Sequence, residues 1–472
     1  MLDIVLIREK PDWVKEQLTK LNDATSIPRI DEILRLDTER RTLLTDVEKV
    51  QSHRNKLNKG VGRLRGDKNL EPGEKIARAF LVTQALKAKD FAKAEAVLIG
   101  DHEPVDIDPN GDLMDALDDM TTELKNISNY VNEINDRVKK IDAELEENML
   151  WLPNIPHEST PVADSEEANI AWKPEGEMPE FDFTPKPHWD LAPELDIIDF
   201  ERGVKLAGTR AYILKGWGAR LQRALINFFL DMAREKGFEE VYVPFFVNEP
   251  MMYGSAQFPK FRDVVYHDQD ADIYMLPTAE VAITNMFRDE ILSEDDLPMY
   301  FVGSTPCFRR EKTSAGRDTR GIKRVHQFQK VEMYKFTTPE TSYDELETLT
   351  EAAADLCRAL KIPFRRLEIV TGDLGFSATK KYDIEMWAPG CEEWLEVSSC
   401  SNTESFQARR ANVKYRAEGQ KKPQFVHTLN GSGLGLTRVI IAVMENYQQA
   451  DGSVVIPEVL RPYLGGAEVI TQ

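Results

Sequence analysis

The sequence is poor in features that mark secreted, metal-clustered or membrane-spanning chains. It has only four cysteines among 472 residues, and no two of them form a C-x-x-C pair. This scarcity excludes a disulfide framework and argues against a zinc cluster held by thiolates. No run approaches about 18 uninterrupted apolar residues, and an acid stands early in the N-terminal segment. We therefore expect a cytoplasmic protein with no zinc and no membrane partner.

Basic residues are also in deficit. The chain has 81 acidic and 60 basic residues, which gives a formal net charge of -21 at pH 7. Such a surface repels polyanions on average, so any contact with nucleic acid requires a local basic patch. Hydrophobic residues make up 42% of the sequence. This excludes a chain that is disordered throughout, and the length predicts more than one domain.

Two long segments carry a narrow apolar stripe with heptad spacing. The first stripe consists of Ile33, Leu36, Leu43, Val47, Val50, Leu57, Val61 and Leu64, with Arg40 and Arg54 at two further seam positions. The second consists of Leu113, Leu117, Met120, Leu124, Ile127, Val131, Ile134, Val138, Ile141 and Leu145. We expect both segments to be helical and to pack on each other, because each has one stripe to bury. Residues 66–110 between them, rich in Pro and Gly with a helical stretch at 77–98, form an elaborated tip insertion.

A basic cluster lies near the far end of the first helix. Its members Arg54, Lys56, Lys59, Arg63 and Arg65 are followed by Lys68, with only Asp67 opposing them. The simpler interpretation is a solvated helix end. The alternative is a contact with a phosphate backbone, where each neutralised phosphate releases counterions.

The rest of the chain, from residue 153 onward, lacks this heptad pattern. Residues 153–200 form an aperiodic linker rich in Pro, Glu and Asp. Beyond it, strands are expected at 240–247, 299–308, 325–336, 384–387, 394–398 and 424–429, and helices at 221–232, 343–360 and 436–447. This order predicts an α+β fold with a mixed, mainly antiparallel sheet flanked by helices. We divide the chain into a helical arm at 1–152 and a second domain at 153–472.

The stretch 306–336 carries the most informative chemistry. Period-two geometry places Arg309 and Glu311 on one face of a strand, and Phe328 and Glu332 on one face of the returning strand. A guanidinium offers a rigid fork for phosphate oxygens, and a phenyl face can carry a flat base. Taken one by one, these residues are equally consistent with solvated strand ends.

Two further segments add oxygen ligands and a candidate anion site. Glu396 and Ser399 lie three residues apart, and their oxygen atoms suit Mg²⁺. The alternative interpretation of this segment is a serine-rich turn that binds no metal. The run Asn430-Gly431-Ser432-Gly433-Leu434-Gly435 predicts a glycine turn before a helix that contains Arg438, which favours an anion. It is not a dinucleotide fingerprint, because the third glycine position holds Leu436, and no Walker A run occurs.

Together these segments resemble motifs 2 and 3 of the class II aminoacyl-tRNA synthetases, and most closely those of the seryl-tRNA synthetase family. The strings that carry the resemblance are Thr278-Ala279-Glu280, Thr305-Pro306-Cys307-Phe308-Arg309, Gly316-Arg317-Asp318-Thr319-Arg320-Gly321, Val325-His326-Gln327-Phe328, residues 396–402, Phe406-Gln407-Ala408-Arg409-Arg410 and Asn430-Gly431-Ser432-Gly433-Leu434. They extend through the second domain, and the helical arm matches the family's tRNA-gripping arm. Residues 237–247 resemble motif 1, which implies a twofold dimer.

The resemblance implies a role for each matching position. ATP would be bound by Arg309, Arg310, Glu311, Val325, Phe328, Glu396, Val397, Ser398, Ser399 and Arg438, with Arg309 and Arg438 as the catalytic cations. Serine would be bound by Thr278, Ala279, Glu280, Arg309, Glu332, Asn430 and Ser432. Mg²⁺ would enter with ATP on Glu396 and Ser399, and the basic cluster of the arm (Arg54, Lys56, Lys59, Arg63 and Arg65) would contact tRNA.

The implied activity is attachment of L-serine to tRNA(Ser) through a seryl-adenylate, in a homodimer. Whether tRNA(Sec) is also a substrate stays open at the level of sequence. One alternative is a synthetase-like ligase that passes an activated small amino acid to a non-tRNA acceptor. Another is a coiled-coil interaction protein with an inactive catalytic domain. The basic-tipped hairpin disfavours the first, and the joint presence of Arg309, Glu311, Glu396 and Arg438 disfavours the second.

Overall fold

The computed structural model describes residues 1–105, 112–312 and 320–472. These residues form two compact units, one of Pro28–Met149 and one of Met1–Ile27 with Leu150–Gln472. The sequence-based division assigned residues 1–27 to the arm, whereas the structure groups them with the second unit. Charge contacts explain the difference: Asp3 pairs with Arg409 at 2.9 Å, and the N-terminal amino group donates to the carbonyl of Phe406.

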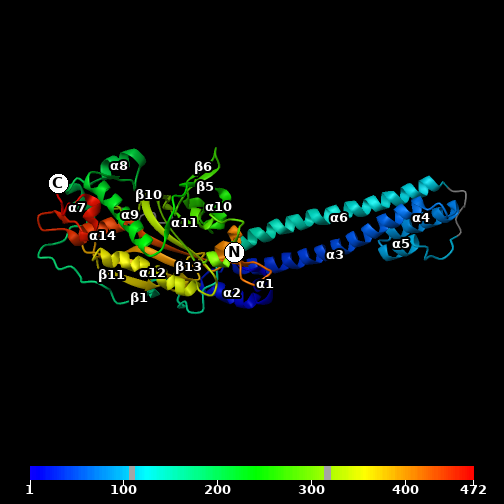
Figure 1. Cartoon of the computed structure of the whole chain (residues 1–472), viewed down its shortest axis with the longest axis horizontal. Coiled ribbons are helices and arrows are strands. Elements are labelled where there is room, and N and C mark those ends of the chain that lie inside the picture. The colour runs from blue at the N-terminus through cyan, green and yellow to red at the C-terminus, as the bar shows by residue number, and fades with distance from the viewer. Residues whose placement is uncertain (106–111, 313–319) are drawn as a thin grey trace. The chain divides into compact units, whose positions relative to one another are not determined.

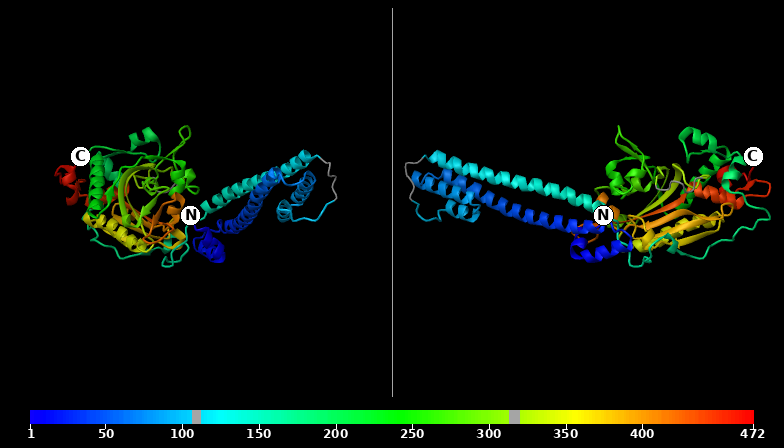
Figure 2. Two further views of the ribbon diagram at one scale, coloured as in Figure 1. Left: turned by 45° about the vertical axis from the view of Figure 1, so that its right-hand side comes forward. Right: turned by 180° about the vertical axis from the view of Figure 1, so that it is seen from behind.

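The arm unit is built on the two predicted helices. α3 (Ile27–Gly66) and α6 (Leu113–Leu150) run side by side in every view (Figures 1 and 2). Nearly all of the predicted heptad residues are buried between them, with Leu43 and Leu113 at the margin of this core. The polar seam position Arg40 forms an ion pair with Asp142 across the helices. The heptad prediction is therefore confirmed in the described part of the arm.

The tip holds two helices where the sequence predicted one helical stretch. α4 (Pro72–Lys87) and α5 (Phe91–Leu98) are separated at Asp90, whose side chain accepts from the amide of Lys93 and begins the second helix. α5 packs closely on α3, because a Cβ at Gly60 would lie 2.8 Å from Leu98 Cδ1. Part of the predicted insertion, residues 106–110, lies outside the described residues.

The second unit is centred on an eight-stranded sheet with the order β1-β11-β12-β13-β16-β10-β9-β4. The strands are β1 (Ile170–Ala171), β4 (Glu239–Glu240), β9 (Met299–Phe308), β10 (Gln327–Thr337), β11 (Phe364–Glu368), β12 (Lys380–Ala388), β13 (Glu393–Asn402) and β16 (His427–Gly435). All neighbours are antiparallel except β4 and β9. The predicted α+β class and its mainly antiparallel sheet are confirmed.

Helices cover the two faces of this sheet unequally (Figure 1). The long helices α9 (Trp217–Glu235), α12 (Ser342–Ala359) and α14 (Leu436–Tyr447) share one core with Val331 and Met333 of β10. The short helices α10 (Glu249–Gly254), α11 (Glu280–Thr284) and α13 (Phe406–Ala411) share the other core with Tyr334 and Phe336. Alternation along β10 places Phe328, Lys330 and Glu332 on this second face, which is less fully covered.

Smaller elements complete the unit. They are α1 (Ile4–Glu9), α2 (Pro11–Lys20), α7 (His188–Glu194), β2 (Ile198–Asp199), α8 (Phe200–Ala207), β3 (Ile213–Leu214), β5 (Phe246–Asn248), β6 (His267–Asp268), β7 (Ile273–Met275), β8 (Ile291–Ser293), β14 (Lys414–Arg416), β15 (Gln424–Phe425), β17 (Val454–Val455) and β18 (Val469–Ile470). Two short strands, β4 and β5, replace the continuous strand predicted at 240–247. Among the helices of the described ranges, none has the length and hydropathy needed to span a bilayer.

The predicted glycine turn after residue 429 is wrong. Asn430 to Gly435 instead form the second half of β16, and α14 begins directly after it. The glycines are needed for close packing: a Cβ at Gly431 would lie 3.0 Å from Leu349 Cγ, and one at Gly433 would lie 3.0 Å from Val331 Cγ1. The alternating partners Asn430 and Ser432 therefore point away from the long helices.

Candidate active site

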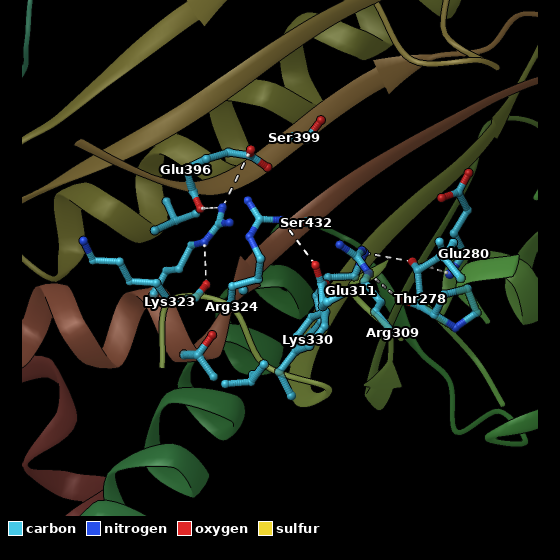
Figure 3. Close-up of a pocket in the computed structure, with 18 of the residues that line it drawn as sticks. Thr278, Glu280, Arg309, Glu311, Lys323, Arg324, Lys330, Glu396, Ser399 and Ser432 are labelled. Carbon is cyan, nitrogen blue, oxygen red and sulfur yellow. Dashed lines mark hydrogen bonds and ion pairs between the residues drawn. The ribbon is translucent and has the colours of Figure 1, made fainter. Parts of the chain in front are cut away.

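A cavity of about 560 Å³ opens on the second face of the sheet (Figure 3). Its lining residues come from β10, β13, β16, the starts of α11 and α14, and the segments before β6, after β7, after β9 and before β10. Five of the lining residues in the described chain are cationic and three are acidic. The cations are Arg309, Lys323, Arg324, Lys330 and Arg438, and the acids are Glu280, Glu311 and Glu396. Figure 3 shows Lys323 and Glu396 at one side and Thr278 and Glu280 at the other.

Arg438, in the first turn of α14, is fixed at one end of the cavity. Its Nη1 donates to the carbonyl of Glu396 at 2.6 Å, and its Nε donates to the carbonyl of Lys323 at 3.3 Å. Its guanidinium also lies 3.7 Å from the Glu396 carboxylate. A guanidinium held by two carbonyls keeps one edge available to an anion, because its donors form a rigid fork.

Arg309 and Phe328 form the middle of the cavity. The guanidinium of Arg309 lies 5.1 Å from the centre of the Phe328 ring, and its Nε donates to the carbonyl of Pro277 at 3.3 Å. Arg309 directly follows β9, and Phe328 on β10 pairs with Cys307, two residues before Arg309. The neighbouring Glu311 adopts a positive φ of 49° and accepts from Arg324 at 3.3 Å. A cation and an aromatic face thus meet at the point where the two strands diverge.

Three of the lining cations were not singled out by sequence. Lys330 lies between Phe328 and Glu332 at period two, so the alternation along the strand could have identified it. Lys323 and Arg324 follow the long loop after β9 and have no periodic signal. Only the pairing of β9 with β10 brings them to the cavity.

The opposite end of the cavity is built on buried carboxylates. Thr278 Oγ1 donates to Glu332 Oε2 at 2.7 Å, and Lys330 donates to Thr278 at 2.8 Å and pairs with Glu332. Glu332 has no exposed surface, and its Oε1 has no hydrogen-bond partner in the described chain. An acceptor left unpaired at this depth costs free energy.

Glu280 forms the second buried carboxylate at this end. It accepts from Gln407 Nε2 at 2.6 Å and from Asn430 Nδ2 at 3.4 Å. Burial and the charge of Glu332 raise the pKa of Glu280 to about 7. Gln407 is in turn held by the hydroxyls of Tyr334 and Thr428, both at 2.9 Å. Gln407 belongs to a string that marked the family resemblance, but sequence gave it no role.

The predicted Mg²⁺ position has hard oxygen donors. Glu396 and Ser399 both line the cavity, and Asp383 lies opposite Ser399 in the β12–β13 ladder. Enclosure raises the pKa of Glu396, but the charges of Arg438, Lys381 and Arg309 outweigh this effect and keep that pKa below its usual range. One carboxylate oxygen of Asp383 is buried without a partner in the described residues. An ionised carboxylate, a hydroxyl and a nearby spare carboxylate oxygen fit a divalent cation of the Mg²⁺ type.

Most predicted ligand residues line one cavity. Those that do are Thr278, Glu280, Arg309, Glu311, Val325, Phe328, Glu396, Val397, Ser399, Asn430, Ser432 and Arg438. Four lie behind or beside it. Ala279 and Glu332 are buried, Ser398 donates to the carbonyl of Ser432 at 2.6 Å, and the guanidinium of Arg310 lies 5.9 Å from the Tyr266 ring centre. Of the string at 316–321, residues 316–319 lie outside the described residues.

The basic cluster of the arm is less uniform than the sequence suggested. Lys59 and Arg63 are exposed on α3. Lys56 is exposed but pairs with Glu95 at 3.3 Å, and Arg65 donates to the carbonyl of Leu117 at 3.2 Å. Arg54 has a buried Nε in the seam with no partner among the described residues. Lys59 and Arg63 are thus the clearest candidates for an external anion.

Comparisons with known proteins agree with this geometry. Residues 261–447 match the family model described as the tRNA synthetase class II core domain (G, H, P, S and T), and residues 1–97 match the seryl-tRNA synthetase N-terminal domain. A serine–tRNA ligase of Roseiflexus sp. (strain RS-1) is 50% identical, over 100% of this chain and 99% of that protein. The chain belongs to the seryl-tRNA synthetase family. A family member from Chloroflexus aurantiacus, also a serine–tRNA ligase, is 46% identical over all of both chains.

Solved structures of the family share the fold over the full length. A seryl-tRNA synthetase from Pyrococcus horikoshii complexed with ATP has a TM-score of 0.83 and 36% identity, and the match covers 100% of this chain and 99% of that one. A cytoplasmic serine–tRNA ligase from Naegleria fowleri in complex with AMP has a TM-score of 0.77 and 28% identity, with the same coverage. The predicted family, its class II catalytic fold and its status as an enzyme are therefore confirmed.

Proposed function

We propose that this enzyme joins L-serine to tRNA(Ser) in two steps. The serine carboxylate first attacks the α-phosphorus of ATP, which gives seryl-adenylate and releases pyrophosphate. The 3'-terminal ribose hydroxyl of the tRNA then takes the seryl group and releases AMP. One observation carries this proposal: a single cavity is lined by the cations Lys323 and Arg324 at one end and by the buried carboxylate of Glu280 at the other (Figure 3).

The chain's own side chains act mainly by positioning. In this proposal Arg309 holds the α-phosphate, and Arg438 holds the far end of the triphosphate. Phe328 offers its ring to the adenine beside Val325 and Glu311. Fixed cations stabilise charge as it develops on the phosphorus and need no reorganisation at that moment. Little side-chain acid or base chemistry is required, since phosphoryl transfer depends chiefly on alignment and charge.

A divalent cation completes the phosphate site in this proposal. Glu396 and Ser399 would hold Mg²⁺, which offsets the charge of the phosphate oxygens when it is bound with ATP. The lowered pKa of Glu396 keeps its carboxylate ionised and ready for the cation at neutral pH.

Serine selectivity follows from polar pairing. The small pocket at this end is lined by hydrogen-bonding side chains, those of Thr278, Glu280 and Ser432. Behind them, the carboxylate of Glu332 accepts a hydrogen bond from Thr278. A site built to bond a hydroxyl can reject the analogue that lacks it by about 10⁴ to 10⁵, because its buried groups are then unpaired. Alanine is therefore expected to be a poor substrate, and threonine is expected to be excluded sterically because its side chain is larger.

The arm unit is proposed as the tRNA-binding domain. Its exposed cations Lys59 and Arg63 stand on a two-helix scaffold, which suits recognition of RNA by shape and backbone phosphates. The same contacts would serve tRNA(Sec) if its overall shape matches, so both tRNAs are to be assayed. A non-tRNA acceptor has no need of this arm, and the synthetase-like ligase is not favoured.

A homodimer is proposed through the motif 1 region. Tyr242 is 84% exposed and Phe246 is 56% exposed, and both flank the edge strands β4 and β5. Exposed aromatic side chains near a sheet edge are typical of a surface that another protein covers.

All four cysteines are free thiols, in agreement with a reducing compartment such as the cytoplasm, where we propose that the enzyme acts.

Amino-acid-dependent exchange of pyrophosphate into ATP tests the first step. Serine should support exchange without tRNA, whereas alanine, glycine and threonine should support it at least about 100-fold less. Charging of tRNA(Ser) tests the second step, with tRNA(Sec) and an unrelated tRNA in parallel. Exchange with serine but no charging of any tRNA would favour the ligase with another acceptor.

A further inference from the structure

His188, Cys391 and Glu445 form a buried polar cluster that the proposed mechanism does not use. His188 begins α7, Glu445 lies in α14, and neither side chain has exposed surface. His188 Nδ1 lies 3.0 Å from Glu445 Oε1, and Cys391 Sγ lies 3.1 Å from the same oxygen. These three residue types at such separations also form a candidate metal site.

The hydrogen bonds assign the protons in this cluster and disfavour a metal. The backbone amide of Ile322 donates to His188 Nε2 at 3.1 Å, so Nε2 is an acceptor and carries no proton. The ring proton therefore sits on Nδ1 and is donated to Glu445. A metal ion on Nδ1 would displace that proton to Nε2, where it would oppose the Ile322 amide. The cluster is accordingly a hydrogen-bond relay.

Glu445 is the fixed end of this relay. Its carboxylate also accepts from the backbone amides of His188 at 2.8 Å and Cys391 at 3.0 Å. Burial raises the pKa of Glu445, but the hydrogen bonds from His188 and Cys391 outweigh burial and hold this pKa below its usual range. A buried, ionised and fully bonded carboxylate is a rigid anchor, because losing any donor would leave charge unsatisfied.

The other end of the relay holds the segment that returns from the loop into the ATP site. Ile322 is followed by Lys323 and Arg324, which line the cavity. The carbonyl of Lys323 accepts from Arg438 Nε at 3.3 Å, and Arg438 lies about two helical turns before Glu445 in α14. The segment is thus tied to the same helix twice, directly through Arg438 and indirectly through His188.

Gly321 shows how closely the loop backbone approaches the ring. A Cβ at this position would lie 1.9 Å from His188 Nε2, and the residue has a φ of +67°. Only glycine fits, since any other side chain would push the imidazole away from the Ile322 amide. The contact is therefore specific in both conformation and space.

We propose that His188 is a positioning residue of the ATP site. As the neutral Nδ1–H tautomer it links the Ile322 amide to Glu445, and so sets the positions of the Lys323 carbonyl, the Lys323 and Arg324 side chains and Arg438. This inference rests on the proposed function, because it assigns His188 to ATP binding and not to serine binding. A misplacement of about 1 Å at such a site can reduce a rate by about 100-fold.

Two variants separate the two hydrogen bonds of the ring. His188→Gln places an amide oxygen near the position of Nε2, so it can accept from Ile322. His188→Asn places an amide near Nδ1, so it can still donate to Glu445 but no longer reaches Ile322. In serine-dependent pyrophosphate exchange, we expect His188→Asn to raise the KM for ATP about tenfold or more and the KM for serine less than about twofold. His188→Gln should restore the KM for ATP to within about threefold of wild type.

Cys391→Ala is the matched control. It removes a donor to Glu445 but no bond to the loop segment, so the KM for ATP should stay unchanged while thermal stability falls. If His188→Asn does not fold, Gly321→Ala takes its place, since its Cβ would push the imidazole away from the Ile322 amide, and the KM for ATP should again rise. Unchanged KM for ATP in the folded variant, or equal increases for ATP and serine, would overturn the inference. Absence of serine-dependent exchange in the wild type would instead overturn the proposed function.

Discussion

Thr278 donates a hydrogen bond of 2.7 Å to Glu332, a carboxylate that does not itself line the cavity. The pocket wall is thereby fixed by a charge behind it, and Lys330 completes the chain by donating to Thr278 at 2.8 Å. The position of Thr278 in the cavity wall thus depends on residues that lie deeper than those lining the cavity.

Replacement of Glu332 by Gln should weaken serine use more than folding. The amide keeps the size of the side chain but weakens the bond from Thr278, and hydrogen bonds to charged groups contribute about 1.5 to 3 kcal/mol. We expect kcat/KM for serine in pyrophosphate exchange to fall roughly 10- to 100-fold. The KM for ATP should stay within about twofold of wild type. Wild-type kcat/KM for serine in this variant would contradict the role assigned to Glu332.

The pH dependence of serine use should follow Glu280. Burial and the Glu332 charge raise its pKa to about 7 from a usual value of 4.5. Ionisation makes both of its oxygens acceptors and strengthens the hydrogen bonds that they receive, so kcat/KM for serine should rise with pH through about 7 and then level off. A profile in Glu280→Gln that keeps the same inflection would assign it to another group.

Stability should respond to pH in the opposite direction at this residue. A carboxyl whose pKa is raised by folding favours the folded state when protonated. Its contribution is complete below pH 4.5 and is lost as pH rises through about 7. Thermal melts of wild type and Glu280→Gln should therefore converge toward low pH and separate above neutrality.

Charge removal at the arm should affect only the tRNA step. Lys59→Gln and Arg63→Gln together should raise the KM for tRNA and reduce the salt dependence of charging by about one unit of slope per cation. Pyrophosphate exchange should not change. Arg35→Gln is the control, because Arg35 on the same helix is already paired with Glu32 and Glu39. An equal loss in the control would point to general electrostatics and not to a binding site.

Alanine substitutions at two glycines should have opposite effects on stability. Gly431→Ala forces a Cβ to within 3.0 Å of Leu349 Cγ and 3.1 Å of Cys400 Sγ, and overpacking of this kind costs about 1 to 3 kcal/mol. Gly62→Ala places a Cβ on α3 with nothing within 4 Å, and should stabilise the arm by about 0.5 to 1 kcal/mol. Denaturation of the two variants should show melting temperatures on opposite sides of the wild type.

Local pattern was enough to predict the scaffold. Heptad spacing placed Val47, Leu57, Ile127 and Val138 in the core of the arm, because helical periodicity alone determines which side chains share a face. Alternation likewise placed Phe328 and Glu332 on one face of a strand. The glycine segment after Leu429 misled the same approach, since glycine is typical of turns and its use for close packing inside β16 depends on the helix that covers it.

The sequence by itself therefore determined the two arm helices, the α+β class, the family and most of the candidate ligand residues that line the cavity. The tertiary structure decided which of these residues face the cavity. It buried Glu332 behind Thr278, brought Lys323 and Arg324 to the cavity and linked their segment to Glu445 through His188. These relationships join residues 54 to 257 positions apart, and only strand pairing and helix packing bring such residues together. Periodicity along one segment carries no information about them.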